Sequence, residues 1–495
     1  MSSNVKSLKK WKMIIKKIDW EIQEERRELL DKLCSLVEDW EGQYPNLRDF
    51  FRPEEIDWLL IEAVKSAVET DPDCEIVAFL KFVVKTGYED EPKVNKHGKP
   101  ELRRTTALHF ATIRYTQDIV EQLFSIYNRF DVNFISQWGR THFHVACEYG
   151  LDRVVAKFLQ LDQDPNCISQ KSKASLVNPP LHLALEKERM ETTKLLLRNG
   201  ANPNLANSEG FTPLHIICQA GVLAIRVSSF FNMTWTFFKI NDKMQQIVLI
   251  DAQDKLGRTP LQWAVANLLA HEVDVLFDRG AELSSFVFPT DSHFELTFFE
   301  YEHPRKYFIE FTRACRALEV VKRLEKRGYE LNRSDALTIM KLFTKFKFFD
   351  NSEVLEKSWY DEETFASLAK KKDVGPNLSL NDLTRSRPKE VDKLFTHTDY
   401  LDFGIMHYEL FTTHKISPAY TQLRIFNYKP YKTWLYDITV GRFCRRWALE
   451  PLLELTRYQL PILCCEKIIE KLRSEDVLKV CLAAEIVANE DNQNI

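Results

Sequence analysis

The sequence predicts an all-α, elongated protein built mainly from stacked helical repeats, and three observations carry this prediction. A signature of the type Thr-Pro-Leu-His recurs, most clearly at Thr212–His215 in the run SEGFTPLH. Apolar residues follow three- and four-residue steps through most of the chain. Glycine (14) and proline (19) are scarce among 495 residues, which excludes collagen-like, low-complexity and disordered character. A chain of this length exceeds one ordinary hydrophobic core.

Charge and cysteine usage narrow the class further. The net charge of −4 gives no bulk attraction to nucleic acid or to membranes. The ten cysteines contain no CxxC pair, so we expect reduced thiols rather than a disulfide framework or a zinc site. The first residues lack the apolar core of a secretory signal, and no run of about 18 apolar residues could cross a membrane. We therefore expect a cytoplasmic protein, or a nuclear one, without a cofactor.

Residues 1–66 are predicted to be helical, with residues 1–55 forming an N-terminal cap. In SLKKWKMIIKKIDWEIQEERRELLDKL the apolar residues recur at helical steps: Leu8, Trp11, Ile15, Ile18 and Ile22. Its basic half is compatible with a membrane-surface or targeting helix. It is equally compatible with an amphipathic cap whose lysines face solvent. We favour the cap because the acidic run EIQEERRELLD follows at once.

Residues 56–95 are predicted to form a degenerate repeat with helices IDWLLIEAVKSA and EIVAFLKFVVKTG and the return loop YEDEPKVN. Five clear repeats follow over residues 96–283. Their signatures begin at residues 106, 141, 179, 212 and 259, at steps of 35, 38, 33 and 47 residues. The last step predicts an insertion near residues 223–250, either between the two helices of that repeat or inside the second.

Each repeat makes physical sense as a helix pair. Threonine at the start caps a free backbone N–H group, and proline suits the first helical turn. The leucine packs against the neighbouring repeat. Gly200 and Gly280 supply left-handed C-caps after second helices. Because no single repeat can bury its own apolar face, the array is stable only through stacking.

Residues 284–435 carry no signature and are predicted to be a helical connector without strand-rich segments. Helices are expected in KYFIEFTRACRALEVVKRLEKRG, SDALTIMKLFTKFKFF, EVLEKSWYDEETFASLAKK and LSLNDLTRSRPKEVDKLFTHTDYLDF, with KKKDVGPN as the best linker. Residues 436–495 are predicted to form a separate helical block. Its helices are WALEPLLELTRY, a second with Pro461 in its first turn, and a third that Ser474 caps.

The signatures resemble ankyrin repeats over about two-fifths of the chain. The last block resembles the PRANC domain, an F-box-like segment at the end of ankyrin proteins of poxviruses and some insects. The F-box pattern begins with Leu-Pro and continues with apolar, leucine, aspartate and apolar positions. Its counterparts in this chain are Leu460, Pro461, Ile468, Leu472, Asp476 and Val477. The chain departs from the pattern at Leu463, where an acidic residue is common, and at Cys464, where isoleucine is usual.

The resemblance implies a function. F-box helices dock on the Skp adaptor of an SCF ubiquitin ligase with its cullin, and the ankyrin array holds a target. The six residues above would be the adaptor-binding set. An alternative interpretation of the helix pair is a cap that shields the end of the array from water.

Motif searches give no sign of an enzyme, since GxGxxG, GxxxxGK[ST], HExxH and GxSxG are all absent. His142 and His144 form an HxH pair that suits a metal ion. His144 is, however, at the signature position where histidines of the resembling family make internal hydrogen bonds, and we favour that role.

The target-binding residues are expected at the tips between repeats and on the first helices. Trp138 falls at such a tip, where it is either a binding hot spot or a residue packed on the adjacent tip. The full candidate set is Gln137, Trp138, Glu148, Tyr149, Ser208, Glu209, Gln219, Asp254 and Lys255.

Three functional hypotheses follow. The first is a substrate receptor of an SCF-type ubiquitin ligase that binds an unidentified target. The second is a decoy that sequesters a signalling protein, like the inhibitors of NF-kappa-B. The third is a plain interaction scaffold.

Overall fold

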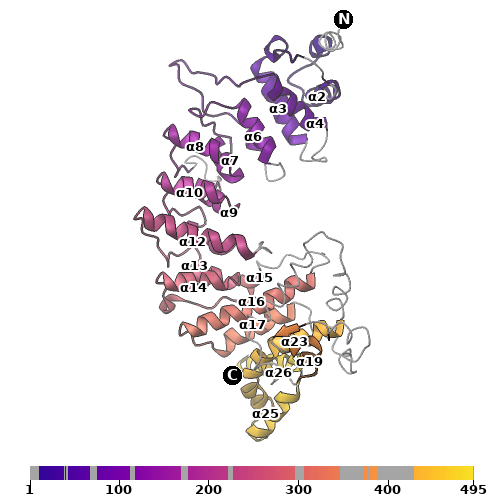
Figure 1. Ribbon diagram of the computed structural model, residues 1–495, viewed down its shortest axis with the longest axis vertical. Helices are drawn as coiled ribbons and strands as arrows, with labels where there is room; N and C mark the ends of the chain where they lie inside the picture. The colour runs from indigo at the N-terminus through magenta and orange to yellow at the C-terminus, as the bar shows by residue number, and fades with distance from the viewer. Residues whose placement is uncertain are drawn as a thin grey trace. The chain divides into compact units, whose positions relative to one another are not determined.

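The computed structural model describes residues 11–37, 40, 43–66, 75–111, 117–168, 177–220, 227–295, 306–345, 370, 373–375, 378–386 and 429–493 (Figure 1). The chain divides into two compact units. Unit 1 comprises residues 1–220 and 226–257, and unit 2 comprises residues 221–225 and 258–495. The fold is all-α, as the sequence predicts, apart from one short pair of strands.

Unit 1 begins with helices that cover its first repeat. A short helix spans residues 11–15, followed by α2 (Gln23–Val37) and the 3-10 helix η1 (Leu47–Asp49). The predicted continuous helix is therefore broken at residues 16–22. There the side chain of Asp19 accepts from the N–H of Glu21, and the N–H of Asp19 donates to Glu25, which is a local alternative to helical bonding. Trp11 is fully buried and packs against Phe51 and Phe82.

The repeats of unit 1 are helix pairs that lie in successive layers (Figure 1). The degenerate repeat has the two helices predicted for it. The bounds in chain order are α3 (Pro53–Ser66), α4 (Glu75–Lys85), α5 (Ala107–Phe110), α6 (Gln117–Ile126), α7 (His142–Tyr149), α8 (Asp152–Gln160), α9 (Pro180–Glu186), α10 (Met190–Arg198), α11 (Pro213–Ala220) and α12 (Val227–Lys243).

The predicted insertion lengthens a helix. Helix α12 has 17 residues, whereas the second helices α8 and α10 have nine each. Of the two alternatives that the sequence left open, the structure thus places much of the extra length inside the second helix. Phe237 and Phe238 of α12 are buried, whereas Trp235 is exposed with the Lys239 ammonium over its ring.

Unit 2 holds the fifth predicted repeat and the helices that follow it. These are α13 (Pro260–Ala266), α14 (Ala270–Asp278), the 3-10 helix η3 (Leu283–Ser285), α15 (Asp291–Glu295), α16 (Lys306–Lys326), α17 (Arg333–Lys345), α19 (Leu380–Arg385), α23 (Lys429–Arg446), α24 (Leu449–Leu455), α25 (Ile462–Lys471) and α26 (Ser474–Gln493). Helix α26 packs against both α23 and α24 and buries Val477, Leu478 and Cys481.

Two features of residues 284–435 differ from the predictions. The linker KKKDVGPN contributes to a two-stranded antiparallel pair, β1 (Asp373–Gly375) with β2 (Leu378–Ser379), in which Asp373 faces Ser379. This corrects the expectation of a plain linker. The predicted helix EVLEKSWYDEETFASLAKK, except for Lys370, and most of LSLNDLTRSRPKEVDKLFTHTDYLDF lie outside the described residues.

The second difference is that the capped helix start of the repeats recurs once more, at Thr290–His293. The N–H of Thr290 donates to His293 Nδ1 over 3.1 Å, as in the earlier repeats. This start was missed because the run TDSH lacks the proline and leucine of the signature. The repeat-like pattern therefore extends into the stretch predicted to be a connector.

Candidate protein-interaction surfaces

One capping arrangement recurs at the repeat starts that begin with threonine. In the cap at Thr106, its N–H donates to His109 Nδ1 over 3.0 Å, and the Nε2 of that ring lies 3.2 Å from the carbonyl oxygen of Phe134 in the next tip. Gln262 replaces the histidine at Thr259 and makes both bonds, at 2.8 Å and 3.0 Å. The signature residues are thus used to join a helix start to the following tip.

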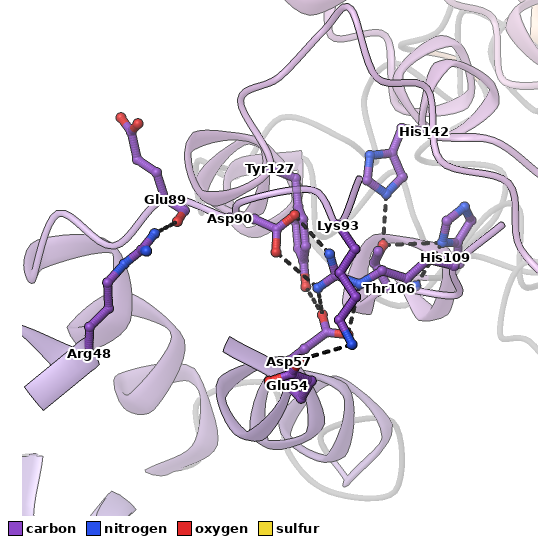
Figure 2. Close-up of polar contacts among 11 residues, drawn as sticks. Arg48, Glu54, Asp57, Glu89, Asp90, Lys93, Thr106, His109, Tyr127 and His142 are labelled. Carbon is purple, nitrogen blue, oxygen red and sulfur yellow. Dashed lines mark hydrogen bonds and ion pairs between the residues drawn. The ribbon is translucent and has the colours of Figure 1, made fainter. Parts of the chain in front are cut away.

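His142 and His144 lie in this framework rather than at an open metal site. The Oγ1 of Thr106 lies 2.7 Å from His142 Nε2 (Figure 2). The Nδ1 of His144 lies 2.7 Å from Thr141 Oγ1. Burial lowers the pKa of His144 to about 3 and that of His109 to about 4, and it lowers the pKa of His142 well below its usual value. These rings are therefore neutral at physiological pH.

A buried ionic cluster joins the degenerate repeat to the first clear repeat. Arg104 bonds both oxygens of Asp90 at 2.9 Å and pairs with Asp57 of α3 at 3.0 Å. The hydroxyl of Tyr127, directly after α6, donates to the same Asp57 over 2.7 Å (Figure 2). Burial raises the pKa of the Asp57 carboxyl, even though the nearby guanidinium opposes that rise. The cluster fixes the hairpin of residues 93–103 against α3 and α6.

Four tips of unit 1 share one turn, and this turn presents two variable residues. The turns are Asn95–Gly98, Ser136–Gly139, Asn207–Gly210 and Asp254–Gly257. In each turn the N–H of the glycine donates to the carbonyl of the first residue over 2.9–3.0 Å, and φ of the glycine is 72–85°. In each, the side chain of the first residue accepts a backbone N–H. The pattern [N/S/D]-x-x-G therefore marks a tip and leaves its two middle residues for contacts.

The middle positions include most of the predicted target-binding residues. Gln137, Trp138, Ser208, Glu209 and Lys255 are all exposed. The same positions hold Lys96, His97 and Leu256, which the sequence reasoning missed although the turn pattern identifies them. Trp138 is 47% exposed and also stacks edge-on against Phe110, 5.4 Å between ring centroids. Because Phe110 belongs to α5, this contact differs from the predicted packing on an adjacent tip, and the role of Trp138 in binding stays a prediction.

The other predicted target-binding residues are covered. Glu148 is buried in an ion pair with Arg140, and Tyr149 is buried beside it on α7. Asp254 is buried because it is the capping residue of its turn, where it accepts from the N–H of Leu256. Gln219 on α11 is half-buried. We therefore correct the candidate surface by leaving Glu148, Tyr149 and Asp254 out of it.

The third and fourth of these tips touch, which gives a first prediction. The N–H of Lys255 donates to the carbonyl of Glu209, and a Cβ added at Gly210 would lie 2.8 Å from that nitrogen at φ +83°. We expect Gly210→Ala to lower the free energy of unfolding of unit 1 by about 2–4 kcal/mol, through backbone strain and the clash. Urea unfolding measures this. Gly257→Ala is the matched control, since Gly257 has φ +75° but open space around it, and it should cost about 1 kcal/mol. Equal losses would contradict the clash.

In unit 2 an apolar face is exposed on α25, which lies at the periphery of the unit (Figure 1). Only Cys465 and Ile469 of this helix are buried. Leu463 is 71% exposed, Ile462 57%, Ile468 38% and Leu460 37%. We call these four residues the α25 face. Apolar side chains gathered on one exposed helix are typical of a surface that another protein covers.

The six predicted adaptor-binding residues divide into three environments. Leu460, Pro461 and Ile468 are exposed, Leu472 and Asp476 are half-buried, and Val477 is fully buried on α26. Val477 is therefore corrected to a core residue, because α26 packs its apolar stripe inward. Ile462 and Leu463 were not predicted. The signal was the run LPILCC, since a helix attached by one narrow stripe cannot bury consecutive apolar residues.

A strained turn sets the direction of α25. Arg457 and Tyr458 both have left-handed backbones, with φ of 51° and 55°. The N–H of Tyr458 donates to Leu453 over 2.8 Å, and its hydroxyl donates to Glu450 over 2.6 Å. Ser474 after the helix donates its N–H to the Asp437 side chain and its hydroxyl to the Asp437 carbonyl on α23, so it tethers the start of α26 to that helix. Both ends of α25 are thus fixed to unit 2.

Two further findings concern other kinds of site. Within the described ranges, no helix is both long enough and apolar enough to cross a membrane. Nor do three or more His, Cys, Asp or Glu side chains gather to hold a metal ion in the part of the chain that the structure covers.

Comparison with known proteins identifies part of the chain. Residues 181–286 match the family model for ankyrin repeats, in three copies. An ankyrin repeat protein of Fowlpox virus (strain NVSL) is 33% identical over 132 residues, which is 26% of this chain and 37% of that protein. The SMC5-SMC6 complex localization factor protein 1 of Bos taurus is 33% identical over 132 residues, 26% of this chain and 12% of that protein.

A third relative is the NF-kappa-B inhibitor zeta of Homo sapiens, 33% identical over 84 residues, 16% of this chain and 11% of that protein. The chain thus spans between 11% and 37% of the lengths of these three relatives. The helix pairs, caps and tips of unit 1 agree with the match to the family model. The all-α chain therefore contains ankyrin repeats, modules through which a protein binds other proteins.

Proposed function

We propose that this chain is the substrate-receptor subunit of an SCF-type ubiquitin ligase in the cytoplasm or nucleus. The exposed tips of unit 1 would hold a target protein, and the α25 face would dock on the Skp adaptor that connects to the cullin. The chain would contribute no active site. It would act by raising the effective concentration of the bound target near the ubiquitin-charged enzyme.

The observation that supports this proposal is the α25 face. Leu460 and Pro461 lie directly before α25, where the F-box pattern has Leu-Pro, and Leu463 and Ile468 are exposed apolar side chains of the helix itself. An apolar helix face of this kind fits a hydrophobic groove on a partner. An end cap would instead turn these side chains inward, against the body of unit 2.

The test is recovery of the Skp adaptor and cullin with the full chain from cells. Leu463→Asp combined with Ile468→Asp should lower adaptor recovery at least about tenfold while target recovery is retained, because two charges on the face prevent docking. Ile486→Asp is the matched control, since Ile486 is exposed on α26 and equally apolar. It should leave adaptor recovery unchanged.

Point variants are preferable to removing residues 458–495. That deletion would strip Val477, Leu478 and Cys481 from contact with α23 and α24 and expose the core of unit 2. If the double variant lowers the melting temperature of the chain by many degrees, α25 is a structural cap. If the unaltered chain never recovers adaptor and cullin, the ligase role fails.

The similarity to NF-kappa-B inhibitor zeta favours a second candidate, a decoy that sequesters a signalling protein without a ligase. The two functions differ in what happens to the target. A receptor shortens the lifetime of its target, and the double variant on α25 restores that lifetime. A decoy leaves the lifetime unchanged and is unaffected by the double variant.

A further inference from the structure

Unit 1 contains a cavity to which the proposed function assigns no ligand. It measures 760 Å³ and lies between the hairpin of residues 93–103 and the second tip. Leu102, Ile135 and Ile168 supply apolar lining, and Arg103 and Gln137 supply polar lining. The volume is in the range of sites that bind a ligand.

The charge of the cavity has one sign. None of the described residues that line the cavity carries a carboxylate. The lining includes two cationic side chains, those of Arg103 and Arg104. Arg104 is neutralised by Asp57 and Asp90. For Arg103 no carboxylate partner exists among the described residues, and its side chain is exposed. Lys96 and Lys99 on the same hairpin are likewise exposed.

The backbone at this place is an open strand edge. Arg103 forms a parallel bridge with Ile135, in which the N–H of Ile135 donates to Leu102 over 2.7 Å and the N–H of Arg104 donates to Ile135 over 3.1 Å. The bridge therefore uses the carbonyl of Leu102 and the N–H of Arg104, which are the neighbours of Arg103. Within the described part of the chain, its own N–H and carbonyl make no hydrogen bond. An extended chain laid along this edge can pair with both groups.

From these features we propose that residues 102–104 and the adjoining cavity bind an extended, acidic segment of a partner protein. Its backbone pairs with Arg103, its carboxylate meets the Arg103 guanidinium, and an apolar side chain enters beside Leu102 and Ile168. The aromatic ring in the described lining is the buried imidazole of His144, so no exposed ring is offered on which bases could stack, which favours a peptide over single-stranded nucleic acid. This inference rests on the proposed function in one respect, since it takes unit 1 as the target-binding part.

The experiment measures fluorescence anisotropy with the full chain and three labelled probes. These are peptides of about ten residues that alternate valine with glutamate or valine with lysine, and an oligouridylate of about ten nucleotides. The glutamate peptide should bind at least about tenfold more tightly than either other probe. Arg103→Glu should weaken that binding at least about tenfold. Arg153→Glu, an exposed arginine on α8 outside the cavity, is the matched control and should leave it unchanged.

Three outcomes would overturn the inference: no preference for the glutamate peptide, tighter binding of the oligouridylate, or equal weakening by the two arginine variants. Its failure is distinguishable from failure of the ligase proposal. Arg103→Glu should still recover the Skp adaptor, because the α25 face belongs to unit 2. A chain that binds the glutamate peptide but never recovers adaptor would refute the ligase role alone.

Discussion

Replacing Arg104 with methionine is expected to lower the free energy of unfolding of unit 1 by about 3–5 kcal/mol. The guanidinium is the shared partner of Asp57 and Asp90, whose side chains are largely buried. Without it, two largely buried carboxylates face each other, although Asp57 retains the hydrogen bond from the Tyr127 hydroxyl. Urea unfolding followed by circular dichroism measures the loss.

The adjacent arginine provides the control for this prediction. Arg103→Met removes an exposed guanidinium without a carboxylate partner among the described residues, so it should change stability by less than about 0.5 kcal/mol. Adding Asp57→Asn and Asp90→Asn to the Arg104 variant should recover much of the loss, because the stranded charges are then gone. If the two arginine variants cost the same, the cluster does not join the repeats in the way described.

The pH dependence of this variant follows from the raised pKa of Asp57. A carboxyl whose pKa is higher in the folded state than in the unfolded chain binds protons preferentially when folded. Acidification therefore favours the folded state through this group. The difference in free energy of unfolding between Arg104→Met and the unaltered chain, both measured at the same pH, should therefore become smaller as the pH falls.

Acidification from pH 7 to pH 5 is expected to destabilise the unaltered unit 1 by several kcal/mol, well before most carboxylates titrate. Burial lowers the pKa of His109 and His182 to about 4 and that of His144 to about 3. The unfolded chain takes up these protons near pH 6.5, while the folded chain does so only near pH 3–4. The stabilisation that these neutral, buried histidines contribute is therefore fully present above about pH 6.5 and declines as the pH falls toward 4.

The loss amounts to about 2 kcal/mol for each such histidine between pH 7 and pH 5. His109→Gln tests the source directly, because Gln262 shows that glutamine makes the same two bonds at this position of the cap. We expect the variant to fold at pH 7 and to lose about 2 kcal/mol less on acidification than the unaltered chain. Unchanged pH dependence of the melting temperature would contradict the assignment.

The repeats were predictable because each residue type of their signature has a defined role in starting a helix. Thr212 and His215 belong to a cap, and such residues have one geometric role wherever they recur. The tip residues Trp138 and Lys255 were found because they lie between repeats. Lys96 and Leu256 were missed, since each lies in a turn that a first polar residue and a final glycine define, and the signature includes neither position.

Burial was harder to predict than secondary structure. Glu148 sits on a first helix where a contact residue was expected, but its partner Arg140 is eight residues earlier and closes over it only in the fold. Val477 follows the F-box pattern in the sequence and yet faces the core, because α26 packs on both α23 and α24. The cavity beside Arg103 depends on a bridge between residues 103 and 135, which no local pattern reveals.

The central claim is that the α25 face docks on the Skp adaptor while unit 1 remains free for a target. Hydrogen exchange of the purified full chain, with and without purified Skp adaptor, tests it most directly. The account predicts slower exchange in residues 458–472 upon addition of the adaptor and unchanged exchange at the tips of residues 95–98 and 136–139. Unchanged exchange across residues 458–472 at saturating adaptor, or protection confined to unit 1, would contradict it.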